Sequence, residues 1–179
     1  TFNPSLDLGM IERAKAADPE AAESEWAGGF RADISAFLDD PTVEAAIDHG
    51  RPLELPPRGG YTFYRAFCDA SGGVGADSYT LAVGHKEGAH FVIDLVRGTG
   101  GKFDPDIVTQ EYAALLREYR AFQVTGDSYA GQWVAGAWRK AGIGYFKSEL
   151  PKSQIYLECL PLFARGLVRL PNHPRLLRE

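Results

Sequence analysis

Two short acidic segments decide how this chain is interpreted: Phe67-Cys68-Asp69-Ala70-Ser71-Gly72-Gly73 and Val124-Thr125-Gly126-Asp127-Ser128-Tyr129-Ala130-Gly131. In each segment one carboxylate follows an apolar, strand-like run and precedes a turn. Hard divalent cations bind oxygen ligands, and carboxylates that leave neighbouring strands side by side can supply them. The pattern therefore predicts a metal site with Asp69 and Asp127 as ligands, and metal-dependent phosphodiester chemistry at that site.

The residues around these two segments predict a mixed sheet flanked by helices. Strand-like runs cover 61–69, 78–85 and 90–96 and are separated by Gly-rich turns, as in a three-stranded antiparallel meander. We then expect a helix that begins at Asp104-Pro105, a strand over 122–125, a helix over 129–141, a strand over 143–146, a helix from about 152 to 163 and a last strand over 167–170. This order is that of an α/β protein with a ribonuclease-H-like fold, whose first strand lies beside the strand that follows the first helix. Asp69 and Asp127 would then meet at the centre of the sheet.

The amino-terminal third has a different pattern from the rest. Residues 1–50 show short helical patterns, and the stretch 51–60 holds three prolines and a Gly pair, which is typical of a linker or boundary. We therefore expect a helical linker or accessory segment over 1–58 and a second domain over 59–179. Because the chain starts without Met and in mid-pattern, we expect it to be a piece of a longer polypeptide.

The net charge of −5 is unevenly distributed. Residues 1–60 carry a balance of −7, whereas residues 97–179 carry +4. This asymmetry permits a local phosphate-facing surface in the carboxyl-terminal half, although exposed Lys and Arg most often only confer solubility. Lys147 and Lys152 follow a central strand and are candidates for contact with a DNA backbone, with solvated lysines as the alternative.

Composition excludes several classes of function. No apolar run approaches the roughly 20 residues that span a bilayer, and the first ten residues lack the pattern of a signal peptide, so we expect a soluble protein without a membrane partner. Cys68 and Cys159 are expected to be unpaired thiols. Neither Gly72-Gly73 nor Gly100-Gly101 is followed by Gly-Lys-Ser/Thr, so the chain by itself should not hydrolyse ATP.

Each candidate residue also has a simpler interpretation. Asp69 could start a turn and Asp127 could cap a helix, but their matching positions in one strand order favour metal binding. Asp94 interrupts an apolar strand and is expected to face solvent or to pair with Arg97. His85 and His90 flank a turn without other ligands at zinc spacing and are expected at the surface.

Several segments in this order resemble the carboxyl-terminal nuclease domain of the large subunit of tailed-phage terminases. They are Phe67 to Gly73 with Asp77-Ser78-Tyr79-Thr80-Leu81-Ala82, then Gly126 to Gly131, Lys152-Ser153-Gln154-Ile155-Tyr156, and Leu170-Pro171-Asn172-His173-Pro174-Arg175-Leu176-Leu177. The upstream Phe30-Arg31-Ala32-Asp33-Ile34 resembles the junction to a packaging ATPase. The resemblance implies an Mg²⁺- or Mn²⁺-dependent endonuclease in the host cytoplasm that cuts concatemeric double-stranded viral DNA with a portal and a small terminase subunit.

One departure from that family concerns the metal site. Proteins of the family carry a third acidic ligand beyond the His173-Pro174-Arg175 segment, near an Asp-Asp pair, and Glu179 is not at the matching place. The resemblance therefore implies an incomplete site with weak metal affinity. Two alternatives stay open: another ribonuclease-H-like nuclease, such as a resolvase or transposase-like protein, or an inactive DNA clamp or assembly domain of the same fold.

Overall fold

A computed structural model describes residues 38–75, 77–127 and 132–177. The chain divides into two compact units, Thr1–Asp40 and Pro41–Glu179. The helices expected within residues 1–37 and the junction-like segment at Phe30 lie outside the described residues. The division into 1–58 and 59–179 stays a prediction, although residues 41–58 belong to the same compact unit as the sheet.

The second unit contains a seven-stranded mixed sheet in the order β1-β7-β4-β3-β2-β5-β6. In chain order the elements are α3 (Asp40–Ala46), β1 (Ile47–Asp48), β2 (Tyr64–Asp69), β3 (Tyr79–Glu87), β4 (His90–Thr99), α4 (Pro105–Glu118), β5 (Gln123–Gly126), α5 (Gln132–Lys140), β6 (Gly144–Lys147), α6 (Lys152–Ala164) and β7 (Val168–Pro171). Strands β2, β3 and β4 form the antiparallel meander, and β5 pairs in parallel with both β2 and β6. The predicted adjacency of β2 and β5 is confirmed. The two-residue strand β1, which pairs with β7, had no signal in the sequence.

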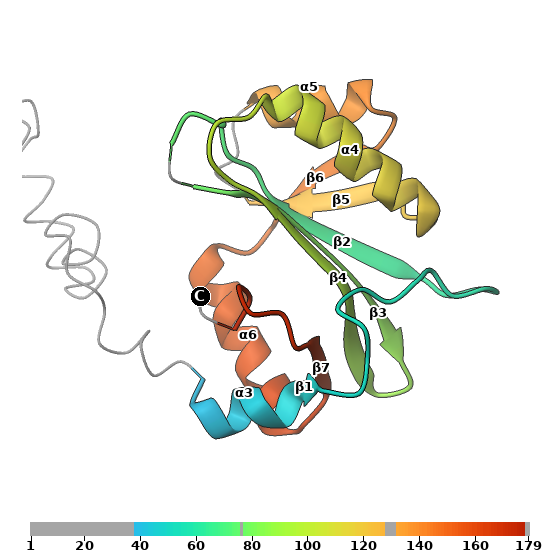
Figure 1. Ribbon diagram of the computed structural model, residues 1–179, viewed down its shortest axis with the longest axis vertical. Helices are drawn as coiled ribbons and strands as arrows, with labels where there is room; N and C mark the ends of the chain where they lie inside the picture. Colours follow the sequence, from blue (N-terminus) through green and yellow to red (C-terminus); the bar gives the residue numbers. More distant parts are fainter. Residues whose placement is uncertain (1–37, 76, 128–131, 178–179) are drawn as a thin grey trace, which may run out of the picture. The chain divides into compact units, whose positions relative to one another are not determined.

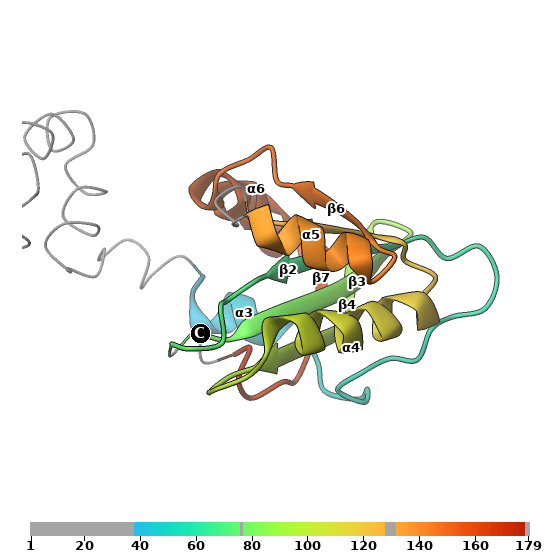
Figure 2. The same cartoon turned by 90° about the horizontal axis from the view of Figure 1, so that it is seen from above.

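One face of the sheet is covered by α4 and α5, as Figures 1 and 2 show. Strand β2 alternates strictly: Tyr64, Ala66 and Cys68 are buried and the residues between them are exposed. The buried side chains of β2, β3 and β5 pack against Val108, Tyr112 and Leu116 of α4 and against Val134 and Trp138 of α5. This packing fixes which face of each strand is turned toward the core.

The other face of the sheet lies toward α6 and α3 (Figures 1 and 2). Helix α6 has no buried residue and its apolar side chains are only partly covered. Cys159 on α6 is half-buried, Cys68 is buried, and both are free thiols, as predicted. In the ranges that the structure describes, no helix is long and apolar enough to cross a membrane.

Local sequence signals explain where α4 begins and α5 ends. The Asp104 carboxylate accepts a hydrogen bond from the backbone N–H of Asp106 at 2.9 Å, and Pro105 occupies the first turn, which is the predicted start of α4. Gly142, two residues past the end of α5, has φ of 77°, a conformation that glycine adopts without strain.

Two expectations about the sheet are wrong. Asp94 is fully buried and His85 is 5% exposed, whereas both were expected near the surface. Val92, two residues before Asp94, is also buried, so alternation places the Asp94 side chain on the core face, where its carboxylate lies 2.6 Å from Nδ1 of His85. Val83 pairs with Leu95 and Gly84 pairs with Ile93, so Asp94 is the extra residue of a β-bulge, which allows the next residue, Leu95, to be buried on the same face. Arg97 instead pairs with Glu54.

Candidate metal centre

The predicted ligands Asp69 and Asp127 follow directly from the pairing of β2 with β5. The two strands run parallel, with Phe67 opposite Thr125 and Cys68 opposite Gly126. The residue that follows Cys68 and the residue that follows Gly126 are both aspartates. Neighbouring strands lie about 4.8 Å apart, so the two aspartates lie side by side at the carboxyl-terminal ends of these strands. Because Cys68 and Gly126 are turned toward the core, alternation directs Asp69 and Asp127 to the opposite face.

Charged neighbours shift the pKa of Asp69. Partial burial raises it, the ammonium of Lys152 lowers it, and the carboxylates of Asp127 and Asp77 raise it again, with the net effect above the ordinary value. Asp69, Asp127, Asp77 and Lys152 therefore form one electrostatic cluster. Asp77 enters it because the glycine-rich turn folds back: the Ser71 hydroxyl donates to the Asp77 carbonyl at 2.9 Å.

A close approach between Gly126 and Tyr145 holds the backbone next to Asp127. A Cβ on Gly126 would overlap with the hydroxyl of Tyr145 and would lie 2.7 Å from Cε2 of its ring, so only glycine fits. The Tyr145 hydroxyl donates a long hydrogen bond, 3.4 Å, to the Asp127 carbonyl oxygen. Burial raises the pKa of Tyr145 to about 12, so this hydroxyl stays a donor at neutral pH.

The loop that follows Asp69 is tied down at Gly73. Its φ of 73° and the carbonyl of Phe103, which a Cβ at this position would meet, both require glycine. The Phe103 N–H donates to the Gly73 carbonyl at 3.2 Å. The turn after the first candidate ligand is therefore built against the segment that leads into α4.

The two candidate lysines differ in their placement. Lys152 begins α6, its Nζ lies 5.8 Å from the centre of the Tyr156 ring, and its charge acts on Asp69. Lys147 ends β6 opposite Gly126, which directs its side chain toward the α5 side of the sheet. The structure therefore brings Lys152 to the acidic pair and leaves Lys147 at the same edge but on the other face.

The chemistry of the donor set fits a hard divalent cation. Asp69 and Asp127 offer oxygen atoms, and a cation between them would oppose both causes of the raised pKa of Asp69, which are its partial burial and, to a smaller extent, the neighbouring carboxylates. Among the described residues, no three His, Cys, Asp or Glu side chains lie close enough together to hold a metal ion. The pair is thus a partial ligand set.

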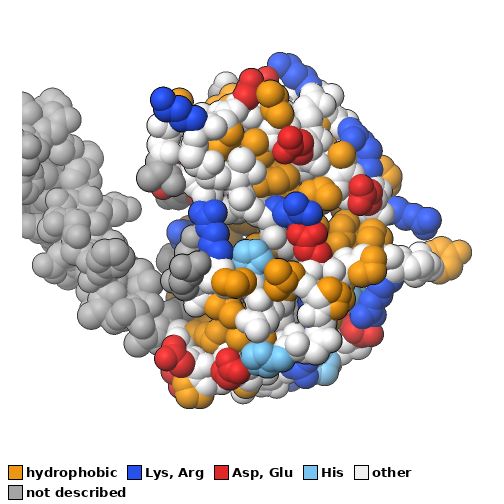
Figure 3. Space-filling view, viewed as in Figure 1, with side chains coloured by type: hydrophobic (Ala, Val, Ile, Leu, Met, Phe, Trp, Pro, Cys, Tyr) orange, Lys and Arg blue, Asp and Glu red, His pale blue; other side chains and the backbone are white. Residues whose placement is uncertain are grey.

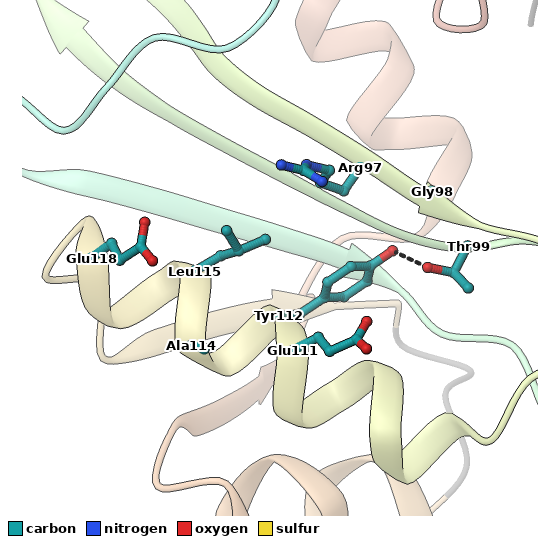
Figure 4. A pocket seen from close by; sticks show the side chains of 8 residues that line it. All are labelled: Arg97, Gly98, Thr99, Glu111, Tyr112, Ala114, Leu115 and Glu118. Atoms are coloured by element: carbon teal, nitrogen blue, oxygen red, sulfur yellow. Dashed lines mark hydrogen bonds between the residues drawn. The ribbon is translucent and has the colours of Figure 1, made fainter.

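Two hollows in the described part of the chain lie elsewhere. One, of about 400 Å³, lies between β4 and α4, where the Tyr112 hydroxyl is 3.1 Å from Oγ1 of Thr99 (Figure 4). The other, of about 290 Å³, includes Arg51 and Arg169 near the opposite end of β4. Neither aspartate lines either hollow.

Side chains of both charges alternate with apolar ones on the surface drawn in Figure 3. This mixed pattern shows no broad basic area on that face. A polyanion that contacted this face would therefore meet individual cations and not a broad basic area.

Comparison with known proteins supports the fold. No protein-family model and no curated protein matches the chain. The zinc-bound large terminase nuclease of the thermophilic phage G20c is 20% identical with a TM-score of 0.59, over 77% of this chain and 83% of that one, and the same nuclease has been solved with cobalt and with magnesium. The P22 large terminase nuclease domain is 10% identical with a TM-score of 0.52, over 72% and 69% of the two chains. The HK97 large terminase is 14% identical with a TM-score of 0.59, and the match spans 97% of this chain and 47% of that one.

These structures and the strand order define the chain as an α/β protein with a ribonuclease-H-like fold. Within that fold it is similar to the nuclease domains of phage large terminases, which confirms the resemblance seen in the sequence.

Proposed function

We propose that this chain is the metal-dependent endonuclease domain of a phage DNA-packaging terminase. The observation that carries the proposal is the parallel register of β2 and β5, which places Asp69 and Asp127 at adjacent strand ends on one face of the sheet. Two carboxylates at strand ends that line neither described hollow suit a substrate as large as duplex DNA, which could not enter a closed pocket.

In this proposal Asp69 and Asp127 hold Mg²⁺ or Mn²⁺. When bound, two such ions supply Lewis-acid polarisation of the phosphodiester and a water of lowered pKa. The chain's own contribution is to keep the ligands ionised and in place. Lys152 lowers the pKa of Asp69 and so favours its ionised form, while Tyr145 holds the Asp127 backbone.

DNA binding would rest on phosphate contacts, because a nuclease that cuts without strong sequence preference draws most of its affinity from them. Lys152, beside the acids, and Lys147, at the end of the neighbouring strand, are the proposed contacts. The large terminases to which the fold is similar support a wider proposal: cutting of concatemeric viral DNA in the host cytoplasm, together with a portal, a small terminase subunit and an ATPase domain of the same polypeptide.

The test is cleavage of linear and supercoiled duplex DNA by the purified protein in Mn²⁺ or Mg²⁺. We expect cleavage that EDTA abolishes and that Asp69→Asn and Asp127→Asn each eliminate. Asp106→Asn, which makes the same chemical change on exposed α4, is the matched control and should cleave like the parent. Cleavage that survives in both ligand variants would contradict the proposed site.

The two alternative functions predict different results in the same experiment. A resolvase or transposase-like nuclease would prefer a branched junction or a transposon end over plain duplex. A DNA clamp would retain duplex in EDTA and would cut nothing with any divalent ion. The partial ligand set found among the described residues makes the clamp the alternative with a specific observation in its favour.

A further inference from the structure

The hollow of about 290 Å³ beside β4 is lined by segments that lie far apart in the sequence. Arg51 and Arg58 come from the segment between β1 and β2, His90 from the start of β4, and Arg169 from β7. In this part of the sheet β7 lies between β1 and β4 (Figure 1). The fold therefore gathers three arginines in one hollow that neither Asp69 nor Asp127 lines.

Carboxylates neutralise only part of the charge in this hollow. Arg58 forms an ion pair with Glu87, in which Nη1 lies 2.7 Å from Oε1. Asp48, the other carboxylate that lines the hollow, accepts a hydrogen bond from the backbone N–H of Gly50 at 3.2 Å. Three arginines against two carboxylates leave one positive charge in excess, so the hollow attracts anions.

The guanidinium of Arg169 is held in place by uncharged groups. Its Nη1 donates to the backbone carbonyls of Gly166 and Val168 at 3.2 and 3.1 Å, and its Nη2 lies 3.2 Å from Nε2 of His90. Because a guanidinium only donates hydrogen bonds, Nε2 of His90 accepts this one, which leaves the imidazole uncharged. Among the described residues no carboxylate forms an ion pair with Arg169, so its charge is oriented but not neutralised.

Arg51 likewise has no ion-pair partner in the described part of the chain. Its Nη2 donates to the Ile93 carbonyl at 2.8 Å, whereas its Nη1 is buried without a hydrogen-bond partner among the described residues. Burial lowers the pKa of Arg51, and the carboxylates of Asp94 and Asp48 offset this effect only in part. An anion in the hollow would stabilise the charged guanidinium further.

We propose that this hollow binds a phosphoryl group between Arg51 and Arg169. Arginine binds phosphate oxygens through its planar fork of N–H groups, and Nε and one N–H of Nη2 in Arg169 have no partner among the described residues. The proposal goes beyond the proposed nuclease function and does not rest on it.

The phosphoryl site is separate from the acidic pair. Arg169 lies opposite Val92, which is buried on the core face of β4, whereas Asp69 lies on the other face of the sheet. Along β3 the distance runs from Thr80, which lies opposite Asp69, to Glu87, and at about 3.4 Å per residue it is about 24 Å. A phosphate bound in the hollow is therefore not the phosphate that the aspartates would meet.

The experiment is a titration of the melting temperature with inorganic phosphate that replaces chloride at constant pH and ionic strength. It is carried out in EDTA, so that no divalent ion at the acidic pair can retain phosphate. We expect a saturable rise for the parent and an apparent affinity at least tenfold weaker for Arg169→Ala. Arg169→Lys keeps the charge without the fork and should lie between the two. Arg139→Ala, which removes an exposed cation from α5, is the matched control and should keep the affinity of the parent.

Duplex binding at several salt concentrations, also in EDTA, identifies the source of the phosphoryl group. If Arg169→Ala lowers the slope of log K against log salt by about 1, the hollow holds a backbone phosphate of DNA. If Arg169→Ala loses inorganic phosphate and keeps the slope, the ligand is a free phosphate or a phosphate monoester. Either result supports the site.

A second variant tests the charge balance in the opposite direction. Glu87→Gln removes one of the two carboxylates and frees Arg58, so inorganic phosphate should bind several-fold more tightly, a gain that partial unfolding cannot produce. Glu111→Gln makes the same change at an exposed position of α4 and should leave the affinity unchanged. General stabilisation by a kosmotropic anion would not saturate and would be equal in all variants. That outcome, or equal phosphate affinities of the parent, Arg169→Ala and Glu87→Gln, would overturn the proposal.

Discussion

Nδ1 of His85 lies 2.6 Å from a carboxylate oxygen of Asp94, and the two side chains are 2% and 0% exposed. The pair is buried on the α4 side, where His85 packs edge-on against the Tyr64 ring at 5.5 Å. The Asp94 backbone carbonyl accepts a hydrogen bond from the N–H of Leu55 at 2.9 Å. This backbone hydrogen bond joins the segment before β2 to the sheet next to the buried pair.

Removal of the Asp94 carboxylate should destabilise the fold strongly. Asp94→Ala leaves the buried His85 nitrogen without its partner, which we expect to cost about 3 kcal/mol. Urea unfolding followed by far-UV circular dichroism measures it. Glu54→Ala, which breaks the exposed ion pair with Arg97, is the matched control and should cost less than about 1 kcal/mol. Equal losses in the two variants would show that burial of the His85–Asp94 pair does not matter.

The stability of the metal-free protein should depend on pH through Asp69. Because the pKa of Asp69 is raised in the folded state, the folded protein holds this proton to higher pH than the unfolded chain does. Stability therefore falls as the pH rises from the ordinary aspartate value of 3.8 through the raised folded value. Asp69→Asn lacks this loss, so it should equal or exceed the parent in melting temperature at neutral pH.

Melting curves in EDTA at a series of pH values between 3 and 8 check this expectation. The difference in melting temperature between Asp69→Asn and the parent should grow in favour of the variant as the pH rises and then level off. Glu111→Gln, on the exposed side of α4, serves as the control for loss of one carboxylate. An Asp69→Asn variant that unfolds would identify Asp69 as a structural turn residue instead.

Gly126 should not tolerate a side chain. In Gly126→Ala the new methyl group would overlap with the Tyr145 ring, and we expect a loss of about 1–3 kcal/mol together with reduced cleavage, because Asp127 is the next residue. Gly144→Ala is the control, since its Cβ would meet Cε2 of Phe146 at an ordinary 3.4 Å. Denaturant unfolding of both variants gives the comparison. In the double variant Gly126→Ala/Tyr145→Ala the two costs should not add.

The two lysines proposed to bind DNA can be separated by salt dependence. Each of Lys152→Ala and Lys147→Ala should weaken binding to all sequences about equally and lower the salt slope by roughly 1, because each removes one phosphate contact. The measurement is duplex binding at several salt concentrations for the parent and both variants. If only Lys147→Ala leaves the salt slope unchanged, the DNA binds on the face of the sheet that carries Asp69 and Asp127. If both variants leave the slope unchanged, the DNA binds at another part of the surface.

Patterns in the sequence were sufficient for the order of elements from β2 onward, whereas the two-residue strand β1 had no signal. Period-two alternation over β2 and β3, the Asp104-Pro105 start of α4 and Gly142 after α5 are local properties of the backbone, so they can be found without knowledge of the fold. The order of strands and helices restricts the possible topologies. The sequence therefore also predicted that β2 and β5 are neighbours and that Asp69 lies next to Asp127.

The tertiary structure decided what depends on contacts between distant residues. The bulge at Asp94 changes the alternation of β4, so that Leu95 is buried next to Asp94, and Gly84 opposite this part of β4 lies so close to the carbonyl of Val92 that a Cβ would not fit. The alternation from Tyr79 through Val83 continues to His85 and indicates its burial, whereas its position beside a turn indicates the surface. No pattern in the sequence indicates that Arg175 lies beside Gly98. More than seventy residues separate the two, and only the folded sheet brings the arginine side chain to this glycine.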